Sequence, residues 1–398
     1  MTSWRNESSF TLIELLVVIA ILGVLATAVI LVINPAELLK EARDSTRLSD
    51  LASLNSALNL FQVDQYNQSL GTASTTYVSV PDTSPTCANL GLPALPSGWA
   101  YACVSTASSS RVDGTGWIPV NFTLISSGSP LSRLPIDPIN TTSSGQYYTY
   151  TSGGSWELTA IPESQKQRAA LQINPPIQNM PGVIAYGSNL SLSPLFNTSG
   201  LVGYWPLDGS PNDSSGNGNN GTWYGSLTNG SYYTGGKIGQ AGNFDGTDDY
   251  VSVPDNLTLR LNSDFTISLW YKEITLIGSY PGILVKGNSG VAGQGYLIFY
   301  ISNGTILYKR DNISPSAANL VTTSWNFLTI TYSGSIWSWY LNGMLKASGT
   351  QVYVTDTSTS SLLFGKGDDF GSGVIDDVRI YNRALSAAEI QAIYNTTK

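Results

Sequence analysis

Histidine is absent from this sequence of 398 residues, and its absence removes several familiar kinds of active site. A Ser-His-Asp triad, a Cys-His dyad and the usual catalytic zinc site all need an imidazole ring. Carboxylates are therefore the only side chains left for ordinary acid–base catalysis.

Charged residues are also scarce, since they make up 12% of the chain, and the net charge is −8. The sequence has no cluster of lysine and arginine that could release counterions from a phosphate backbone, so nucleic acid is not expected as a partner. Serine, threonine, asparagine, glycine and tyrosine are abundant instead, which is typical of exported, β-rich surface proteins. A chain of this length should divide into two or three units, each with its own core.

Only two cysteines occur, Cys87 and Cys103, and both lie in one region rich in proline and serine. Their spacing suits a single local disulfide in an oxidising compartment. Closing this loop would contribute about 3 kcal/mol to stability on the chain-entropy model. Two buried free thiols are the alternative.

One long apolar segment stands near the start of the chain. Residues 15–33 contain a single polar side chain, that of Thr27, and as a helix they would reach about 28 Å, close to the thickness of a bilayer's hydrocarbon core. The segment predicts a membrane-spanning helix at about residues 12–33. A small-residue cleavage site does not follow it, which distinguishes it from a secretory signal.

The predicted helix continues beyond the apolar segment. Between residues 34 and 66, apolar side chains recur at steps of three and four, and the charged residues are expected to face water. Pro35 should kink the helix where it leaves the membrane. The apolar stripe consists of Leu48, Leu51, Leu54, Leu58 and Phe61.

One carboxylate, that of Glu14, interrupts the apolar N-terminal segment. A charged side chain at the centre of a membrane span costs about 2.5–3.5 kcal/mol, so Glu14 is expected to have a partner. The stretch FTLIELLVVIAILGVLA, which begins at Phe10, resembles the type IV pilin and pseudopilin family over about the first seventy residues. The resemblance implies cleavage before Phe10 by a prepilin peptidase, N-methylation of the new amine and packing of subunit helices into a filament core. Glu14 would then neutralise the Phe10 amine of a neighbouring subunit.

The same resemblance suggests how the first half of the chain is divided. Residues 1–9 would be the leader, with Ser9 standing where the family has glycine before the cleaved bond, and residues 10–70 the pilin helix. Residues 71–174 lose helical periodicity and predict short antiparallel strands, similar to the small sheet of pilin globular domains. Residues 175–199, which mix proline, glycine and polar side chains, predict a linker with room for one strand.

Two polar residues in the pilin-like region allow two interpretations. Asp137 and Asn140, in LPIDPIN, could supply oxygens to a calcium ion, as loops in some secretion pseudopilins do. The favoured interpretation is that they form an Asx turn beside Pro138.

Residues 200–398 predict an all-β unit, because short runs of β-branched and aromatic residues alternate with turn residues. The stretch DFTISLWYK alternates as a strand with two different faces should, and Asn342-Gly343 predicts a hairpin. A sandwich is the natural packing for such strands. Ser386 and Glu389 form a capping-box pattern at the start of a C-terminal helix. This helix should dock through Leu385, Ile390 and Ile393.

Five motifs of this unit, among them GQAGNFDGTDDYVSVPDN and GVIDDVRIYNRALSAAEI, resemble the laminin-G-like, concanavalin A-like jelly-roll family. The family implies two curved antiparallel sheets, often a structural calcium near the chain ends, and often binding of glycans or protein surfaces. Ca²⁺ takes six to eight oxygen ligands, and the acidic loops supply them, although strand-ending turns are the alternative role of each residue. The acidic loops contain Asp208, Asp213, Asp245, Asp248, Asp249, Asp376 and Asp377. The metal ligands expected first are Asp208, Asp213 and Asp376, in segments that meet at the ends of this fold.

The C-terminal unit is expected to bind rather than to catalyse. Glucanases of the same fold resemble one another in a Glu-x-Asp-x-x-Glu strand, and this sequence has no such stretch, since Glu273 and Glu389 are the only glutamates after Glu163. Sugar binding would use exposed aromatic faces, but the alternation of the strand turns Trp337 and Trp339 inward. The ligand-binding residues themselves are not predicted.

Together these patterns predict an α+β multidomain protein: a long transmembrane and amphipathic helix with a small antiparallel sheet, followed by an all-β concanavalin A-like sandwich. The expected function is that of a minor type IV pilin-like subunit that displays a lectin-like domain for adhesion to glycans or surface proteins. It would be a single-pass membrane protein before assembly and part of a cell-surface pilus afterwards. Two alternatives stay open: a pseudopilin of a type II-like secretion system that recognises cargo, and a membrane-anchored surface protein that does not assemble.

Overall fold

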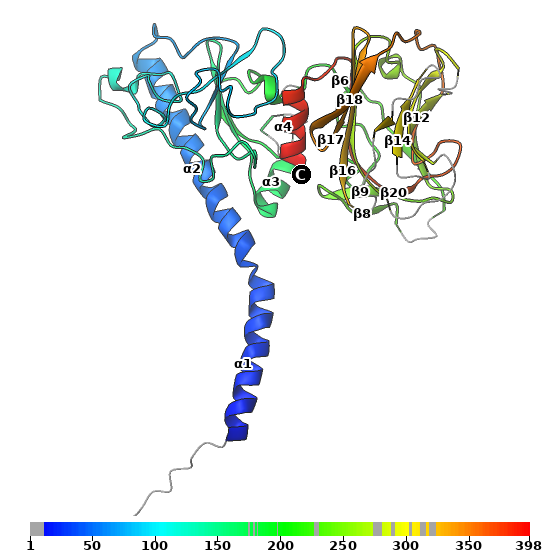
Figure 1. The fold of residues 1–398 in the computed structure, drawn as a ribbon, viewed down its shortest axis with the longest axis horizontal. Coiled ribbons are helices and arrows are strands. Elements are labelled where there is room, and N and C mark those ends of the chain that lie inside the picture. Colours follow the sequence, from blue (N-terminus) through cyan, green and yellow to red (C-terminus); the bar gives the residue numbers. More distant parts are fainter. Residues whose placement is uncertain are drawn as a thin grey trace, which may run out of the picture.

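The computed structural model describes residues 12–173, 176–177, 180, 182–196, 198–226, 231–273, 281–287, 291–301, 305–310, 316–317 and 324–398. Figure 1 shows three parts along the chain: a long N-terminal helical rod, a small α/β unit around its far end, and a β-sandwich. The sheets are mostly antiparallel, as the sequence predicts.

The rod consists of two helices, α1 (Leu12–Ile33) and α2 (Pro35–Asp64). Asn34 between them has a left-handed backbone with φ of 44°, and its side chain accepts a hydrogen bond from the N–H of Glu37. Proline suits the first turn of a helix, where its missing N–H needs no partner. The break predicted at Pro35 is confirmed, and the direction of the rod changes there (Figure 1).

The predicted transmembrane span at about residues 12–33 receives no support. Within the described part of the chain, no helix combines the length and the apolarity needed to cross a membrane.

The inner face of α2 builds the core of the α/β unit. Leu51, Leu54, Leu58 and Phe61 are at most 1% exposed, and Leu48 packs against the same core, so the predicted apolar stripe is confirmed. These side chains pack against aromatic residues of the sheet and its loops, which include Trp117, Phe122, Tyr148, Tyr150 and Trp156.

A five-stranded sheet lies against α2, in the order β2-β1-β3-β4-β5. Its fifth strand, β5, falls within residues 175–199 and pairs with β4, so the predicted linker contributes an edge strand to this sheet. A short helix, α3 (Gln165–Ile173), and a 3₁₀ turn, η1 (Phe122–Leu124), complete the unit. The strands are β1 (Thr75–Val78), β2 (Ala100–Ala102), β3 (Thr149–Ser152), β4 (Trp156–Ala160) and β5 (Ile184–Gly187).

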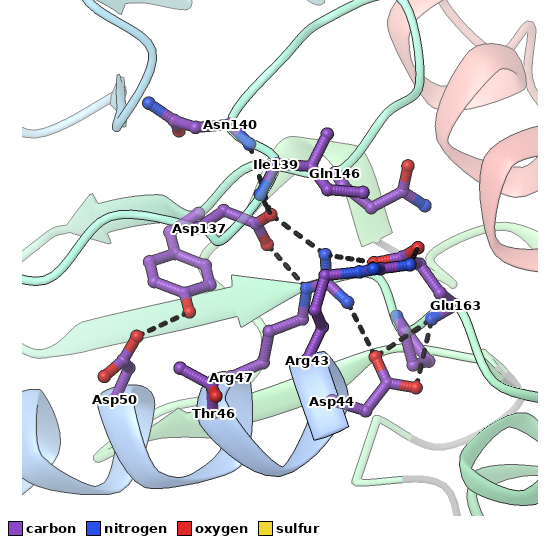
Figure 2. Close-up of polar contacts among 12 residues, drawn as sticks. Arg43, Asp44, Thr46, Arg47, Asp50, Asp137, Ile139, Asn140, Gln146 and Glu163 are labelled. Atoms are coloured by element: carbon purple, nitrogen blue, oxygen red, sulfur yellow. Dashed lines mark hydrogen bonds and ion pairs between the residues drawn. The ribbon is translucent and has the colours of Figure 1, made fainter. Parts of the chain in front are cut away.

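A buried ion network fixes α2 to the rest of this unit, as Figure 2 shows. The guanidinium of Arg47 is fully buried and forms ion pairs with Asp137, Asp44 and Glu163 at 2.6, 2.7 and 2.6 Å. Asp44 also accepts hydrogen bonds from the backbone N–H groups of Glu163 and Ser164. The expectation that the charged residues of α2 all face water is therefore wrong for Asp44 and Arg47.

Asp137 and Asn140 form the predicted turn. One oxygen of Asp137 accepts the N–H groups of Ile139 and Asn140 at 2.8 and 3.2 Å, while both of its oxygens bind Arg47. Asn140 has a φ of 51° and binds Ser79. The carboxylate of Asp137 is thus occupied by the guanidinium and the turn, which favours the turn over a calcium ligand.

The C-terminal part is a sandwich of two antiparallel sheets. One sheet has seven strands in the order β15-β14-β13-β12-β19-β10-β7; the other has eight, in the order β18-β17-β16-β11-β20-β9-β8 with β6 paired to β20. One large core lies between them and includes Trp205, Phe244, Ile267, Ile330 and Phe364. The strands are β6 (Leu201–Trp205), β7 (Thr222–Tyr224), β8 (Tyr233–Gly235), β9 (Gln240–Asp245), β10 (Tyr250–Val253), β11 (Phe265–Glu273), β12 (Gly282–Gly287), β13 (Gly295–Ile301), β14 (Thr305–Lys309), β15 (Ser316–Ala317), β16 (Asn326–Ser333), β17 (Ile336–Leu341), β18 (Met344–Thr350), β19 (Leu362–Phe364) and β20 (Ser372–Tyr381).

Strand β11 has the two faces that its sequence predicts. Phe265, Ile267, Leu269 and Tyr271 belong to the core between the sheets, whereas Trp270 points to the other face and joins a second core. The predicted hairpin at Asn342-Gly343 is also present, between β17 and β18, with φ of 52° and 77° at the two residues.

The second core is centred on the C-terminal helix, α4 (Ala387–Thr397), which lies between the α/β unit and the sandwich (Figure 1). The predicted capping box is present, because the side chains of Ser386 and Glu389 each accept the other's backbone N–H. The residues expected to dock the helix are buried: Leu385, Ile390 and Ile393 are each at most 4% exposed.

Helix α4 contacts both neighbouring units directly. The indole N–H of Trp270 on β11 donates to the hydroxyl of Thr397 at 2.9 Å, and the N–H of Ala388 donates to the carbonyl of Ala94 at 3.2 Å. The same core includes Val183 and Leu195 from residues 175–199, where η2 (Pro194–Phe196) lies. The sandwich is thus joined to the α/β unit through a packed core.

Replacing Arg47 with methionine should lower the free energy of unfolding by about 3–5 kcal/mol, because the buried carboxylates of Asp44 and Asp137 lose their counterion. Glu163 would keep its ion pair with Arg43. Chemical unfolding of the full chain measures this change. Lys166→Ala is the matched control: it removes an ion pair with Glu41 whose lysine is 78% exposed, and the expected loss is below about 1 kcal/mol. Equal losses in the two variants would contradict a special role for Arg47.

A second prediction concerns Glu157 on β4, which is 1% exposed and accepts the N–H groups of Leu192 and Ser193, both at 2.8 Å. Burial raises the pKa of this carboxyl from 4.5 to about 7. The folded chain therefore holds a proton that the unfolded chain releases near pH 4.5, so this group's contribution to stability falls as the pH rises from about 4.5 to 7.

Glu157→Gln removes that titration while keeping an oxygen that can accept both N–H groups. Its unfolding free energy relative to wild type should rise between pH 4.5 and 7.5, by at most about 3 kcal/mol. Unfolding curves at a series of pH values measure the difference. A difference that stays flat with pH would show that the pKa of the Glu157 carboxyl is not raised in the folded chain.

Candidate functional site

The residues predicted for processing and assembly lie at the start of the rod. Ser9 and Phe10 fall outside the described residues. Glu14 lies in the first turn of α1, where the helix dipole favours a carboxylate. The large apolar side chains from Leu12 to Leu22 are 43–80% exposed, so in this structure α1 presents an apolar surface that requires a cover.

The predicted disulfide is present between Cys87 and Cys103, whose Cα atoms are 5.3 Å apart. Both cysteines are buried in a small core with Val78 and Val80. The loop that the disulfide closes contains Ala94, whose carbonyl accepts the N–H of Ala388 on α4. The disulfide therefore closes the loop of the α/β unit that contacts the C-terminal helix.

Asp213, the second of the three predicted metal ligands, organises its own loop. Oδ1 accepts the N–H groups of Tyr204 and Ser215, and Oδ2 accepts the Ser215 hydroxyl and the N–H of Asn219, all at 2.8–2.9 Å. Four donors thus share this carboxylate, which matches the alternative role of a turn residue.

Asp208 and Asp376 meet at a different loop, which connects β8 to β9. Asp376 accepts the N–H groups of Lys237 and Ile238 at 2.8 and 2.9 Å, and Asp208 accepts the N–H of Gln240 at 2.6 Å. Burial raises the pKa of Asp376 well above its usual range, and the charges of Asp377 and Asp208 raise it further. The structure therefore brings two of the three predicted ligands to one loop, and Asp213 stands in another. A calcium ion held by all three stays a prediction.

A different set of carboxylates is closely grouped, at the end of β9 and in the turn that leads to β10. We call this set the acidic corner: Asp245, Asp248 and Asp249. One carboxylate oxygen of each residue lies within 4.8 Å of one oxygen of each of the other two. Asp249 is 4% exposed. Burial raises its pKa to about 6, and the charges of Asp245 and Asp248 act in the same direction. These three residues belong to the acidic loops that the sequence analysis identifies. Nothing in the sequence indicates that they lie closer together than the other acidic residues of the domain.

Flat aromatic faces lie beside the acidic corner, on the outermost strand of the seven-stranded sheet. Tyr224 on β7 stacks on Tyr250 of β10 with ring centroids 4.9 Å apart and planes 11° apart, and Tyr224 is 47% exposed. The ammonium of Lys366 lies 4.3 Å from the centroid of the Tyr250 ring. We call these three residues the β7 edge surface. An exposed aromatic ring next to a cation is able to hold a sugar, whose apolar C–H face stacks on the ring.

Other tryptophans belong to the interior, as the alternation of their strand predicts. Trp339 is fully buried in the core between the sheets, and Trp337 packs against the same core. Trp223, next to Tyr224, stacks on Tyr232 at 4.7 Å and also contacts Phe244 of the core.

Comparison with known families supports both resemblances. A family model described as the prokaryotic N-terminal methylation motif matches residues 4–30, and one described as the concanavalin A-like lectin/glucanases superfamily matches residues 245–391. The chain thus combines a pilin-type N-terminal motif with a concanavalin A-like domain. No curated protein matches the chain.

Solved structures match about half of the chain at low identity. Domain 4 of AbnA, a GH43 extracellular arabinanase from Geobacillus stearothermophilus in complex with arabinotriose, is 24% identical with a TM-score of 0.39, over 48% of this chain and 97% of that one. The binding domain of Paraclostridial Mosquitocidal Protein 1 is 20% identical with a TM-score of 0.41, over 50% of this chain and 52% of that one. A structure of botulinum neurotoxin type C, whose cell entry depends on two ganglioside molecules, is 15% identical with a TM-score of 0.42 and the same coverage. The chain spans about half the length of the two toxin structures.

Proposed function

We propose that this chain is a minor subunit of a type IV pilus-like filament and that its sandwich adheres to glycans or surface proteins. One observation carries the proposal: a single chain joins an N-terminal methylation motif, at residues 4–30, to a concanavalin A-like domain at residues 245–391. The first feature suits insertion into a helical filament, and the second suits recognition at a surface.

The exposed apolar side chains of α1 support assembly through the rod. In the proposed filament, α1 packs among the helices of other subunits after a prepilin peptidase has cleaved before Phe10. Glu14 neutralises the methylated Phe10 amine of a neighbouring subunit. Before assembly the chain is a single-pass membrane protein, and afterwards it lies on the cell surface.

The packing of α4 favours a minor subunit over a major one. Residues 175–199 include β5 and η2 and contribute to the core around α4, so they do not behave as a long free tether in the described part of the chain. The sandwich consequently keeps its place beside the α/β unit. A domain of nearly 200 residues in that place would crowd a filament in which every subunit carried one.

We also propose that the sandwich binds without catalysis. Its β7 edge surface offers an exposed tyrosine ring and a lysine, and the sequence has no Glu-x-Asp-x-x-Glu stretch of the kind that glucanases of this fold share. Ligand recognition by stacking and hydrogen bonding suits these groups better than general acid catalysis.

Glu14→Ala should leave membrane insertion intact and reduce filament incorporation at least tenfold, because the buried amine of the neighbouring subunit loses its counterion. Sheared filaments and membranes are compared by immunoblot, and mass spectrometry of the wild-type N-terminus should show methylated Phe10. An intact leader would contradict both the pilus and the pseudopilus. Methylated Phe10 without release by shear would favour the secretion pseudopilus.

Tyr224→Ala should weaken binding of the full chain to glycans at least tenfold, since stacking on an exposed ring is lost. The measurement is a glycan array followed by titration of the best ligand. Tyr66→Ala is the control, because Tyr66 is 80% exposed but belongs to the end of the rod. Binding that survives Tyr224→Ala would move the ligand site elsewhere, and no glycan binding at all would leave recognition of proteins.

A further inference from the structure

A cavity of about 530 Å³, which we call the interface cavity, lies between the α/β unit and the sandwich. Residues of α2, of α3, of the loop from β8 to β9 and of the end of α4 line it. The acidic residue of this lining is Glu163, which already pairs with Arg43 and Arg47. The basic residues of the lining are Lys40, Arg168, Lys237 and Lys398. A chain of net charge −8 thus gathers cations around one cavity, where their mutual repulsion costs free energy.

Lys237, on the loop from β8 to β9, brings a cation from the sandwich. Its ammonium lies 5.1 Å from the centroid of the Trp270 ring, and the indole N–H of Trp270 is fixed by the hydroxyl of Thr397 on α4. Asp376 accepts the backbone N–H of Lys237, and among the residues that the structure describes no carboxylate forms an ion pair with the ammonium. Burial lowers the pKa of Lys237, the charge of Arg168 lowers it further, and the charge of Asp376 opposes them.

Arg168 and Lys398 bring two further cations from other elements. The guanidinium of Arg168, on α3, donates to the carbonyl oxygens of Pro162, at 3.1 Å, and Lys398. The Lys398 ammonium, at the end of α4, donates to the carbonyl oxygen of Ser144 and to Asn395 Oδ1 at 3.0 and 2.9 Å. Burial lowers the pKa of Arg168 although nearby carboxylates raise it, and burial with the charges of the other two cations lowers the pKa of Lys398. In the described part of the chain, neither side chain has an ion pair with an aspartate or glutamate.

We propose that the interface cavity binds an anion that carries a phosphate group, and that this anion links the α/β unit to the sandwich. A phosphate group has several acceptor oxygens, so it can bind Arg168 of one unit and Lys237 of the other at the same time. Guanidinium and ammonium groups are the common phosphate donors of proteins. Because a water molecule takes about 30 Å³, the cavity has room for a group larger than phosphate itself.

The expected source of this phosphate is the headgroup of an anionic phospholipid, and this part of the proposal rests on the proposed function. Helix α3 and the end of α4 lie on the side of the globular part that faces α1 (Figure 1). Lys40 follows Ile33, the last residue of α1, by seven residues, which is about 10 Å along a helix. The headgroup region extends about 5–8 Å beyond the hydrocarbon core on each side. With α1 in the membrane before assembly, the interface cavity would lie next to the headgroups.

The test uses the full chain in an uncharged detergent at low ionic strength, because salt screens the attraction between charges. Inorganic phosphate is titrated in one arm and a short-chain phosphatidylglycerol in the other, by calorimetry and by thermal unfolding. Wild type should bind about one anion and unfold at a higher temperature with it, since the anion binds the folded chain. Lys237→Gln should lose at least tenfold in affinity in both arms, because a charge-assisted hydrogen bond is lost.

Two control variants separate the charge of Lys237 from its packing on Trp270. Lys237→Arg keeps the charge and should bind phosphate within about threefold of wild type. Lys346→Gln removes an exposed lysine of β18, at the opposite edge of the same sheet from β8, and should bind phosphate as wild type does. Arg168 is kept in every variant, because its contacts with main-chain carbonyl groups also hold the fold.

Absence of binding to wild type in both arms up to about 10 mM would overturn the proposal, since a site with a Kd of about 1 mM would then be nearly filled. Equal losses in Lys237→Gln and Lys346→Gln would overturn it too, as would a Lys237→Arg chain that binds as weakly as Lys237→Gln. Binding of phosphate without binding of phosphatidylglycerol would support the phosphate site and exclude the lipid as its source. Filament incorporation is not part of the readout, so its failure would count against the proposed function alone.

Discussion

The guanidinium of Arg47 is the contact on which the arrangement of the chain depends. It lies on the rod and binds carboxylates from the loop at Asp137 and from Glu163, 90 and more residues further along the chain. Burial alone would lower the pKa of Arg47, but its hydrogen bonds to Asp137 and Asp44 raise it above its usual value, so the charge is retained. The rod is thereby attached to the α/β unit by an ion network that salt screens little.

A second contact, the core around α4, joins the sandwich to the α/β unit. Helix α4 closes the chain by returning to the α/β unit, and its apolar residues fill a core shared with Trp270 and Phe327 on the outer face of the sandwich. The position of the sandwich relative to the rod follows from these two contacts in series. The β7 edge surface therefore has a fixed position relative to the rod.

Local patterns in the sequence predicted much of this fold. The stripe from Leu51 to Phe61, the hairpin at Asn342-Gly343 and the capping box at Ser386 each need only neighbours in the sequence, and all three are confirmed. Local patterns could not predict the burial of Arg47, because two of its partners are distant in the sequence and an arginine on a helix normally faces water. The acidic loops are a second example. Their composition predicts turns rich in oxygen ligands, but the chain's path from β9 in one sheet to β10 in the other decides which carboxylates lie close together.

We infer that one chain places a binding domain on an assembled filament. Immunogold electron microscopy of intact cells that express the full chain, with antibodies against the sandwich, tests this inference. We expect sparse label on surface filaments, with the sandwich accessible outside the filament core. Label confined to the cell envelope, with filaments present but unlabelled, would contradict it.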